Sequence, residues 1–174
     1  MSVPLPPPSI PFPPMLDASA GFDATEPTAW SVYQDDFPKN APLPVIEGEA
    51  IRVRRSFHPG NTTREHTYWH MVTCGGKRDD NDEASRKPDI ERLVRIPWAL
   101  PLLTAYRHPS VKRWREARHG RWSLHVWHTR ANYLLVLREQ NNGLFLITSF
   151  CPAPKNITKY HTRWSAAKKA RHTF

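Results

Sequence analysis

The chain has 174 residues, 39% of them apolar, and it contains 7 Trp, 7 Phe and 5 Tyr. A chain of this length holds one domain of ordinary size with an extension. Two cysteines, Cys74 and Cys151, exclude a disulfide-rich scaffold and suit a reducing cytosol, with one structural disulfide left open. The chain does not start with a basic segment followed by an apolar run, and no stretch approaches the roughly 20 apolar residues of a bilayer span. We therefore expect no membrane partner and a cytoplasmic location, with signal-independent export as an effector left open.

Charge divides the chain near residue 50. Residues 1–50 carry seven acidic and one basic side chain, a net charge of −6, whereas residues 51–174 carry 24 basic and 9 acidic side chains, a net charge of +15. Such a field attracts polyanions, and nucleic acid is the commonest large polyanion in a cell, so RNA is the expected partner. The alternatives left open are a surface that only aids solubility, an acidic protein partner and an anionic membrane.

Proline is concentrated in the acidic segment. Seven of the 18 prolines lie in the first 14 residues, and eleven lie at or before Pro44. Because proline fixes φ and lacks a backbone donor, residues 1–50 are predicted to form an extended arm or linker. The rest, residues 51–174, is predicted to be the folded basic domain. The arm suits two roles: it covers the basic face, or it tethers an inhibitor, an antitoxin or a delivery partner.

Short elements are predicted after the arm. Residues 45–57 alternate apolar and polar side chains around Ile51 and Val53, which predicts a short strand. Residues 68–74 are rich in strand-forming side chains, but a helical turn from Glu65 onward suits them equally. Residues 75–89 are a loop by composition, because two glycines open a run of mixed charge.

Two helices are predicted next. The first begins at Asp89 and stops or kinks at Pro97. The second covers residues 110–119, with Val111 and Trp114 on one helical face.

Three strand-like runs follow the predicted helices. They cover residues 122–129, 132–139 and 143–150, and short turns separate them. Asn142 and Gly143 both tolerate positive φ, so this pair predicts a hairpin turn. The runs therefore predict an antiparallel meander.

The C-terminal segment "KYHTRWSAAKKARH" is basic and rich in helix formers, which suits a terminal helix or a fraying tail. Helices followed by a meander define the expected fold class, an α+β domain of short helices packed on an antiparallel β-meander.

The stretch "EHTYWHMVTCGGK" places His66 and His70 four residues apart. In a helix they share one face, which suits a metal site. Zinc proteases, however, have Glu where Thr67 stands, and no third ligand has a recognisable spacing, so we expect no metal or other cofactor. Two histidines also suit RNA transesterification, which needs a base, an acid and cations. Ordinary hydrogen-bonded histidines remain the alternative for each, and Tyr68 and Trp69 either pack the core or stack a base.

Cationic and hydroxyl side chains supply further candidates. Arg92 and Arg95 lie three residues apart ahead of Trp98, and guanidinium groups bind phosphate through paired hydrogen bonds. Ion pairs with neighbouring carboxylates are the alternative for both arginines. Thr148 interrupts an apolar strand, on the face that strand alternation gives to Leu146 and Phe150, where its hydroxyl can donate to phosphate or be structural.

The order of motifs resembles a known superfamily. "HTYWHMVTCGG", "PDIERLVRIPW", "VKRWREAR", "VWHTRANYLLVL", "LFLITSF" and "KYHTRW" together resemble phage- and plasmid-associated nuclease-like domains of the barnase–EndoU–colicin–RelE superfamily, over about residues 64–164. The resemblance implies short helices on a four-stranded antiparallel sheet and metal-independent ribonuclease activity, often as a toxin.

The resemblance also implies roles for particular residues. The expected catalytic set is His66, His70, Arg95 and Thr148. The expected substrate-binding set is Arg92, Trp98, Lys159, Tyr160 and His161. A non-catalytic nucleic-acid- or protein-binding module of nuclease-like fold is the alternative, and a metal-dependent hydrolase centred on His66 and His70 is a third.

Overall fold

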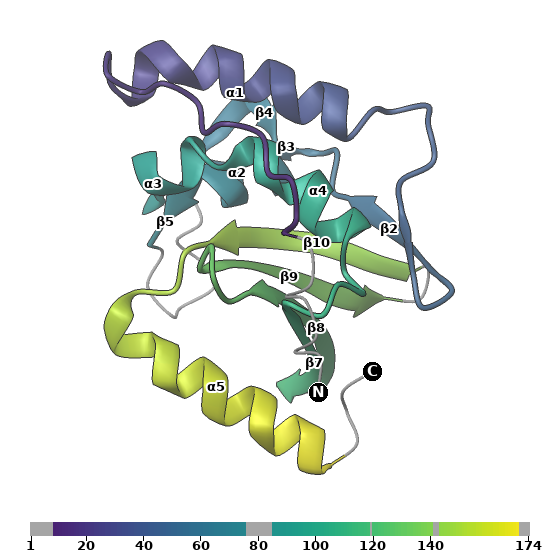
Figure 1. Cartoon of the computed structure of the whole chain (residues 1–174). Helices are drawn as coiled ribbons and strands as arrows, with labels where there is room; N and C mark the ends of the chain where they lie inside the picture. Colours follow the sequence, from purple (N-terminus) through teal and green to yellow (C-terminus); the bar gives the residue numbers. More distant parts are fainter. Residues whose placement is uncertain (1–8, 76–84, 119, 141–142, 171–174) are drawn as a thin grey trace.

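A six-stranded sheet forms the centre of the molecule (Figure 1). The computed structural model describes residues 9–75, 85–118, 120–140 and 143–170. The strands lie in the order β1 (Val45–Ile46), β2 (Glu49–Val53), β10 (Gly143–Phe150), β9 (Tyr133–Gln140), β8 (Arg121–His128) and β7 (Val111–Arg118). All neighbours are antiparallel except β2 and β10, which run parallel over three residue pairs.

Helices cover both faces of the sheet (Figure 1). One face carries α1 (Phe22–Asp36), α2 (His66–Val72), α3 (Ile90–Leu93), the 3-10 helix η2 (Ile96–Trp98) and α4 (Ala99–Thr104), and the other carries α5 (Pro154–Lys169). Two small pairs complete the fold: β3 (Phe57–His58) with β4 (Asn61–Glu65), and β5 (Thr73–Cys74) with β6 (Lys87–Pro88). The expected α+β class is confirmed.

Two apolar clusters lie on opposite faces of the sheet, and β9 contributes to both. Tyr133, Leu135 and Leu137 enter the large cluster beneath α1 to α4, while Leu134 and Val136 face α5. Side chains of a strand alternate between faces, so the unbroken apolar run "YLLVL" is what a strand buried on both sides requires.

The predicted meander is confirmed. Strands β8, β9 and β10 pair consecutively, and Gln140 faces Gly143 across the last hairpin. Gly143 has a φ of +125°, and a Cβ there would collide with the carbonyl oxygen of Ala50 in β2. Glycine is therefore needed where β10 approaches β2. The other half of the predicted turn pair, Asn142, lies outside the described residues.

The prediction of a helix over residues 110–119 is wrong. Residues 111–118 form β7, which pairs with β8 along its whole length, and residue 119 lies outside the described part of the chain. Val111 is buried in the large cluster and Trp114 in the cluster beneath α5. Their spacing of three imitates a helical face, but in a strand it puts the two side chains on opposite faces of a sheet that is covered on both sides.

The acidic N-terminal segment differs from the expected extended arm. Residues 22–36 form the helix α1 despite Pro27 within it. Ile10, Tyr33 and Phe37 are buried in the same cluster as the residues of the sheet. In its described part, from residue 9, this segment therefore supplies core side chains.

Some of the remaining secondary-structure predictions are confirmed, and others differ from the structure. The strand expected in residues 45–57 is β2, the open segment 68–74 is mostly the helix α2, and the C-terminal segment forms most of α5. The helix expected from Asp89 ends at Leu93, because Pro97 has no N–H to donate to the Leu93 carbonyl, and a separate 3-10 turn begins at Ile96. Residues 76–84 of the expected loop lie outside the described part of the chain. In the part that is described, every helix is too short or too polar to cross a bilayer, and both cysteines are free thiols.

Candidate functional site

Three histidines meet where the β3–β4 hairpin joins α2. His58 ends β3, and His66 and His70 lie one turn apart on α2. The rings of His66 and His70 stack with centroids 4.5 Å apart, and His58 lies 5.0 Å from His66 and 5.3 Å from His70. His58 is fully buried, His70 is nearly so, and His66 is half-buried. The structure thus brings together the two predicted histidines and adds a third.

Thr67 fixes the start of α2 to the sheet. Its hydroxyl accepts a hydrogen bond from the Arg54 backbone N–H at 2.8 Å and donates one to the Leu146 carbonyl at 3.1 Å. The hydroxyl therefore joins β10 to Arg54, the residue that follows β2, where the parallel ladder of the two strands ends. Because His66 precedes Thr67 and His70 follows it by three residues, this bridge sets the position of both rings.

Hydrogen bonds also fix the tautomers of two histidines. The Gly60 N–H donates to Nδ1 of His58 at 2.9 Å, so a neutral His58 carries its proton on Nε2. The guanidinium of Arg54 lies 3.2 Å from Nε2 of His66. A guanidinium only donates, so Nε2 of His66 is the acceptor and a neutral His66 carries its proton on Nδ1.

A cavity of about 660 Å³ opens beside the histidines. His66, Thr67 and His70 line one wall. Arg54 and Pro59 extend that wall, and the strands β9 and β10 form the other. The strand residues that line it are Arg138, Gln140, Phe145, Leu146 and Ile147. Acid–base groups and cationic groups therefore share one space.

The structure supplies the third ligand that the sequence did not show, so His58, His66 and His70 could together hold a metal ion. One ligand nitrogen from each histidine lies within 4.8 Å of the others, whereas two nitrogens on a tetrahedral zinc ion lie about 3.3 Å apart. A neutral imidazole has one lone pair in the ring plane, and in His58 and His66 it already accepts a hydrogen bond. A metal would have to displace both hydrogen-bond donors, whereas proton transfer uses the rings as they are.

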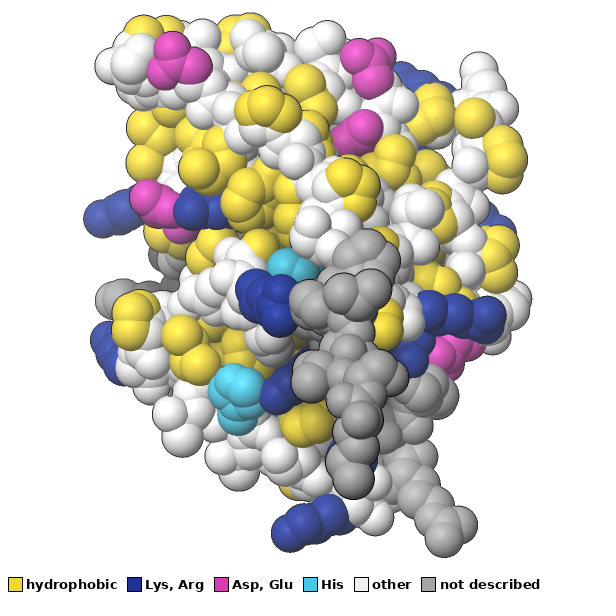
Figure 2. Space-filling view, in the orientation of Figure 1, with side chains coloured by type: hydrophobic (Ala, Val, Ile, Leu, Met, Phe, Trp, Pro, Cys, Tyr) yellow, Lys and Arg dark blue, Asp and Glu magenta, His cyan; other side chains and the backbone are white. Residues whose placement is uncertain are grey.

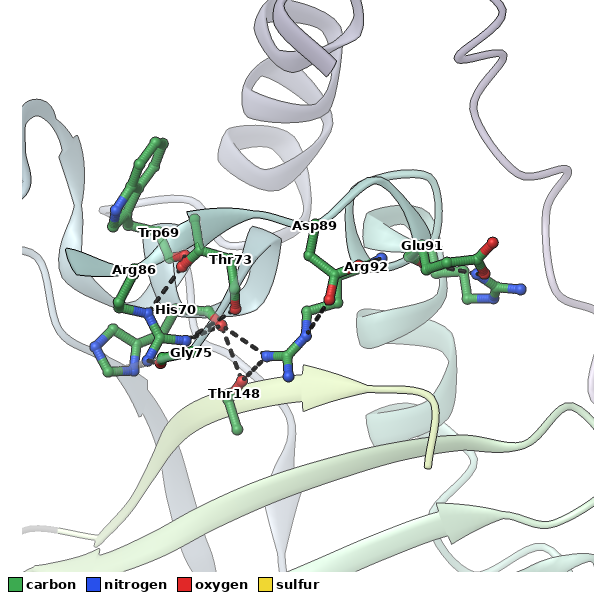
Figure 3. A network of polar contacts seen from close by, with 10 residues as sticks. Trp69, His70, Thr73, Gly75, Arg86, Asp89, Glu91, Arg92 and Thr148 are labelled. Atoms are coloured by element: carbon green, nitrogen blue, oxygen red, sulfur yellow. Dashed lines mark hydrogen bonds and ion pairs between the residues drawn. The ribbon is translucent and has the colours of Figure 1, made fainter. Parts of the chain in front are cut away.

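The predicted residues Arg92 and Thr148 lie at the backbone of His70 (Figure 3). The Thr148 hydroxyl donates to the His70 carbonyl at 2.9 Å, and Arg92 lies 3.3 Å from that hydroxyl and 3.4 Å from the same carbonyl. Asp89 orients Arg92 through an ion pair of 3.1 Å, and Arg86 also reaches the carbonyl of His70, at 3.4 Å. Arg92 and Thr148 thus hold α2 in place through the His70 carbonyl. Contact of either residue with substrate stays a prediction.

A β-bulge in β10 explains the position of Thr148. The pairing with β9 shifts between Leu146 and Thr148, so Leu146 faces Leu137 and Thr148 faces Val136. Leu137 and Val136 point to opposite faces. The prediction that Thr148 shares a face with Leu146 is therefore wrong, because the bulge adds a residue to the strand.

Arg95 and Trp98 make other contacts. Arg95 donates to the carbonyl and carboxylate oxygens of Glu91, both at 2.6 Å. Trp98 donates to the carbonyl of Pro13 at 2.8 Å and stacks on Phe12 with centroids 4.9 Å apart. Neither is among the described residues that line the cavity.

Lys159, Tyr160 and His161 lie on α5. Lys159 is exposed, and Tyr160 packs against the ring of Phe150 at 6.1 Å. Nδ1 of His161 lies 2.8 Å from the ammonium of Lys112, and partial desolvation together with this charge lowers the pKa of His161. In the described part of the molecule, none of the three lines the cavity.

Tyr68 and Trp69, which lie between His66 and His70 in the sequence, have different environments. Tyr68 is fully buried and donates to the Glu26 carbonyl at 3.2 Å. Trp69 is half-buried, with its ring 6.3 Å from that of His58. Tyr68 therefore packs the core, as one of the two predicted alternatives required.

Charge is segregated on the surface (Figure 2). In this view acidic side chains lie mainly over the layer of α1, and Lys and Arg side chains lie mainly over the half that holds the sheet and α5. The division follows the charge boundary near residue 50 of the sequence.

Sequence reasoning missed His58, Arg54 and Arg138. A signal for His58 was present, because Pro59-Gly60 is a turn pair between two short polar runs. A hairpin there returns the chain beside His58 just before His66. The two arginines carry no comparable local signal.

No protein-family model matches the chain, and neither a curated protein nor a solved structure is detectably similar to it. Function must therefore be argued from the residues themselves.

Proposed function

We propose that this protein is a metal-independent ribonuclease, of the barnase–EndoU–colicin–RelE type, that cleaves RNA by transesterification. One observation carries the proposal. His66 and His70, with rings stacked 4.5 Å apart, line the same cavity as Arg54 and Arg138. A base, an acid and cations around one space are what this reaction requires, and a metal ion is not needed.

His66 is assigned as the base. Its Nε2 lies 3.2 Å from the Arg54 guanidinium, and a neutral ring accepts a hydrogen bond there. An RNA phosphate competes for Arg54 and frees the lone pair to take the proton of the 2′-hydroxyl. The 2′-oxygen then bonds to phosphorus, and Arg54 and Arg138 stabilise the charge that develops on the phosphate oxygens.

His70 is assigned as the acid. As the bond from phosphorus to the 5′-oxygen breaks, His70 gives that oxygen a proton, which leaves a 2′,3′-cyclic phosphate and a 5′-hydroxyl. Thr148 and Arg92 act on His70 through its carbonyl and keep α2 in place. His58, fully buried behind the other two, fixes the packing of the rings.

Purified protein incubated with total cellular RNA in excess chelator tests the proposal. We expect discrete fragments that end in 2′,3′-cyclic phosphate, and at least a hundredfold slower cleavage with His66→Gln or His70→Gln. His108→Gln is the matched control, since His108 pairs with Ser110 outside the cavity. Intact RNA despite salt-sensitive binding would favour the non-catalytic binding module.

A toxic role is part of the proposal and has its own test. Induced expression of the wild-type chain should arrest growth of a bacterial host, and the same level of the His70→Gln chain should not. Equal arrest by both would separate toxicity from RNA cleavage.

A further inference from the structure

The strand side of the cavity has a chemistry different from that of the histidine side. Phe145 on β10 faces Arg138 on β9 directly across the ladder, and both line the cavity. Gln140 lies two residues beyond Arg138 and therefore projects from the same face. Side chains opposite each other on antiparallel strands lie about 5 Å apart at Cβ, so the ring, the guanidinium and the amide are neighbours.

These three side chains match a nucleotide. A half-buried aromatic ring offers a stacking surface to any base. The amide of Gln140 has a donor and an acceptor and is exposed, so it can pair with the edge of a base. Arg138 can reach phosphate or stack on the same base. The cavity, at about 660 Å³, falls within the range of roughly 300–1,000 Å³ typical of small-molecule sites.

We propose that Phe145 and Gln140 form a nucleobase subsite that takes one unpaired base of single-stranded RNA next to the phosphate bound at His66. The inference rests on the proposed ribonuclease function and names its substrate class. A base can enter a cavity only when it is unstacked and unpaired, so duplex RNA is excluded. The ring of Phe145 supplies affinity, and the amide of Gln140 supplies the preference for particular bases.

The bulge in β10 is consistent with this placement. Ile147 lines the cavity at the point where β10 gains its extra residue. Bulges bend a strand and re-aim side chains, and they occur often at the edges of sites. The bulge thus shapes the floor of the subsite and also turns Thr148 toward the carbonyl of His70.

Binding of a short single-stranded RNA of mixed sequence, and of the same sequence as a duplex, tests the subsite. With full-length protein in the His70→Gln background, Phe145→Leu should weaken single-strand binding by about tenfold, the loss expected for one stacked base. Phe145→Tyr keeps the ring and should bind as the parent does. Trp122→Leu is the control, because it removes a partly exposed aromatic side chain outside the cavity.

Cleavage-site sequencing supplies the second measurement. In the otherwise wild-type chain, Gln140→Ala should flatten the base preference at the cleaved position. Unchanged base preference, together with equal binding by the Phe145→Leu and Trp122→Leu proteins, would overturn the subsite while the ribonuclease function stood. Equal losses with Phe145→Leu and Phe145→Tyr, or duplex bound as tightly as single strand, would also overturn it. Absent cleavage with ring-dependent binding would support the subsite and reject the ribonuclease.

Discussion

Replacing Thr67 by Val tests whether the Thr67 hydroxyl holds α2, which carries His66 and His70, on the sheet. The two side chains have nearly the same shape, so the change removes the bonds to the Arg54 N–H and the Leu146 carbonyl and little else. Thr67 is only 2% exposed, so water does not readily replace the lost partner. A buried group left without its partner costs about 1–3 kcal/mol, and we expect a loss of about 2 kcal/mol in the free energy of unfolding.

Urea denaturation and a thermal melt measure this loss. For a chain of this size, about 2 kcal/mol corresponds to a fall of roughly 4–8 °C in Tm. The proposed ribonuclease activity should fall as well, because Thr67 lies between His66 and His70 on α2 and anchors both. Thr62→Val is the matched control, since Thr62 is exposed on β4. A Thr67→Val protein within about 0.5 kcal/mol of that control would refute the bridging role.

Three further predictions concern charge and backbone. Burial raises the pKa of Asp36 to about 6. The folded state therefore holds this proton more tightly than the unfolded chain, so Asp36→Asn should stabilise the protein at about pH 7.5, with a gain in urea midpoint that vanishes near pH 4. A gain that is independent of pH would exclude this cause. Burial lowers the pKa of His128, so the free energy of unfolding should fall as the pH drops below about 6.5. His128→Asn keeps an acceptor for the Ala131 N–H and should make the free energy of unfolding less dependent on pH in urea denaturation series. An unchanged pH dependence would contradict the role of His128. Gly143→Ala should cost about 1–3 kcal/mol more than Gly120→Ala, because both glycines have positive φ but only the first meets a backbone oxygen; equal losses in urea would contradict the close approach.

Strand-forming runs separated by short turns predicted the meander, because both are local signals. β8, β9 and β10 are long runs with short turns, and their pairing needs no information from distant residues. The same reasoning failed for β7. The sheet is buried on both faces, and Val111 and Trp114 pack on opposite faces. A pattern that assumes one buried face cannot identify such a strand.

The proline count misled the prediction for the N-terminal segment. Proline predicted an extended arm, but Thr25, Ala29 and Tyr33 recur every four residues and form the buried stripe of α1. Removing residues 1–44 would therefore take side chains out of the core, so a truncation cannot test whether the segment masks the basic surface.

The site was predicted in part. His66 and His70 were found because one helical turn joins them, and that spacing survives in the fold. His58 arrives through a hairpin, and Thr148 reaches the carbonyl of His70 only because a bulge shifts the register of β10. The sequence signals the hairpin through Pro59-Gly60, but it does not show how far the hairpin brings His58 into the core. The bulge in β10 has no sequence signal.

Cleavage of a defined RNA with a single 2′-deoxy substitution tests the central claim most directly. The site of cleavage is first located in the unmodified oligonucleotide in excess chelator, and the deoxynucleotide is then placed on its 5′ side. Transesterification needs the 2′-hydroxyl as nucleophile, so we predict that cleavage stops at that position alone while the unmodified strand yields a 2′,3′-cyclic phosphate. Equal cleavage of the deoxy strand, or activity that chelator abolishes, would contradict the metal-independent mechanism at His66 and His70.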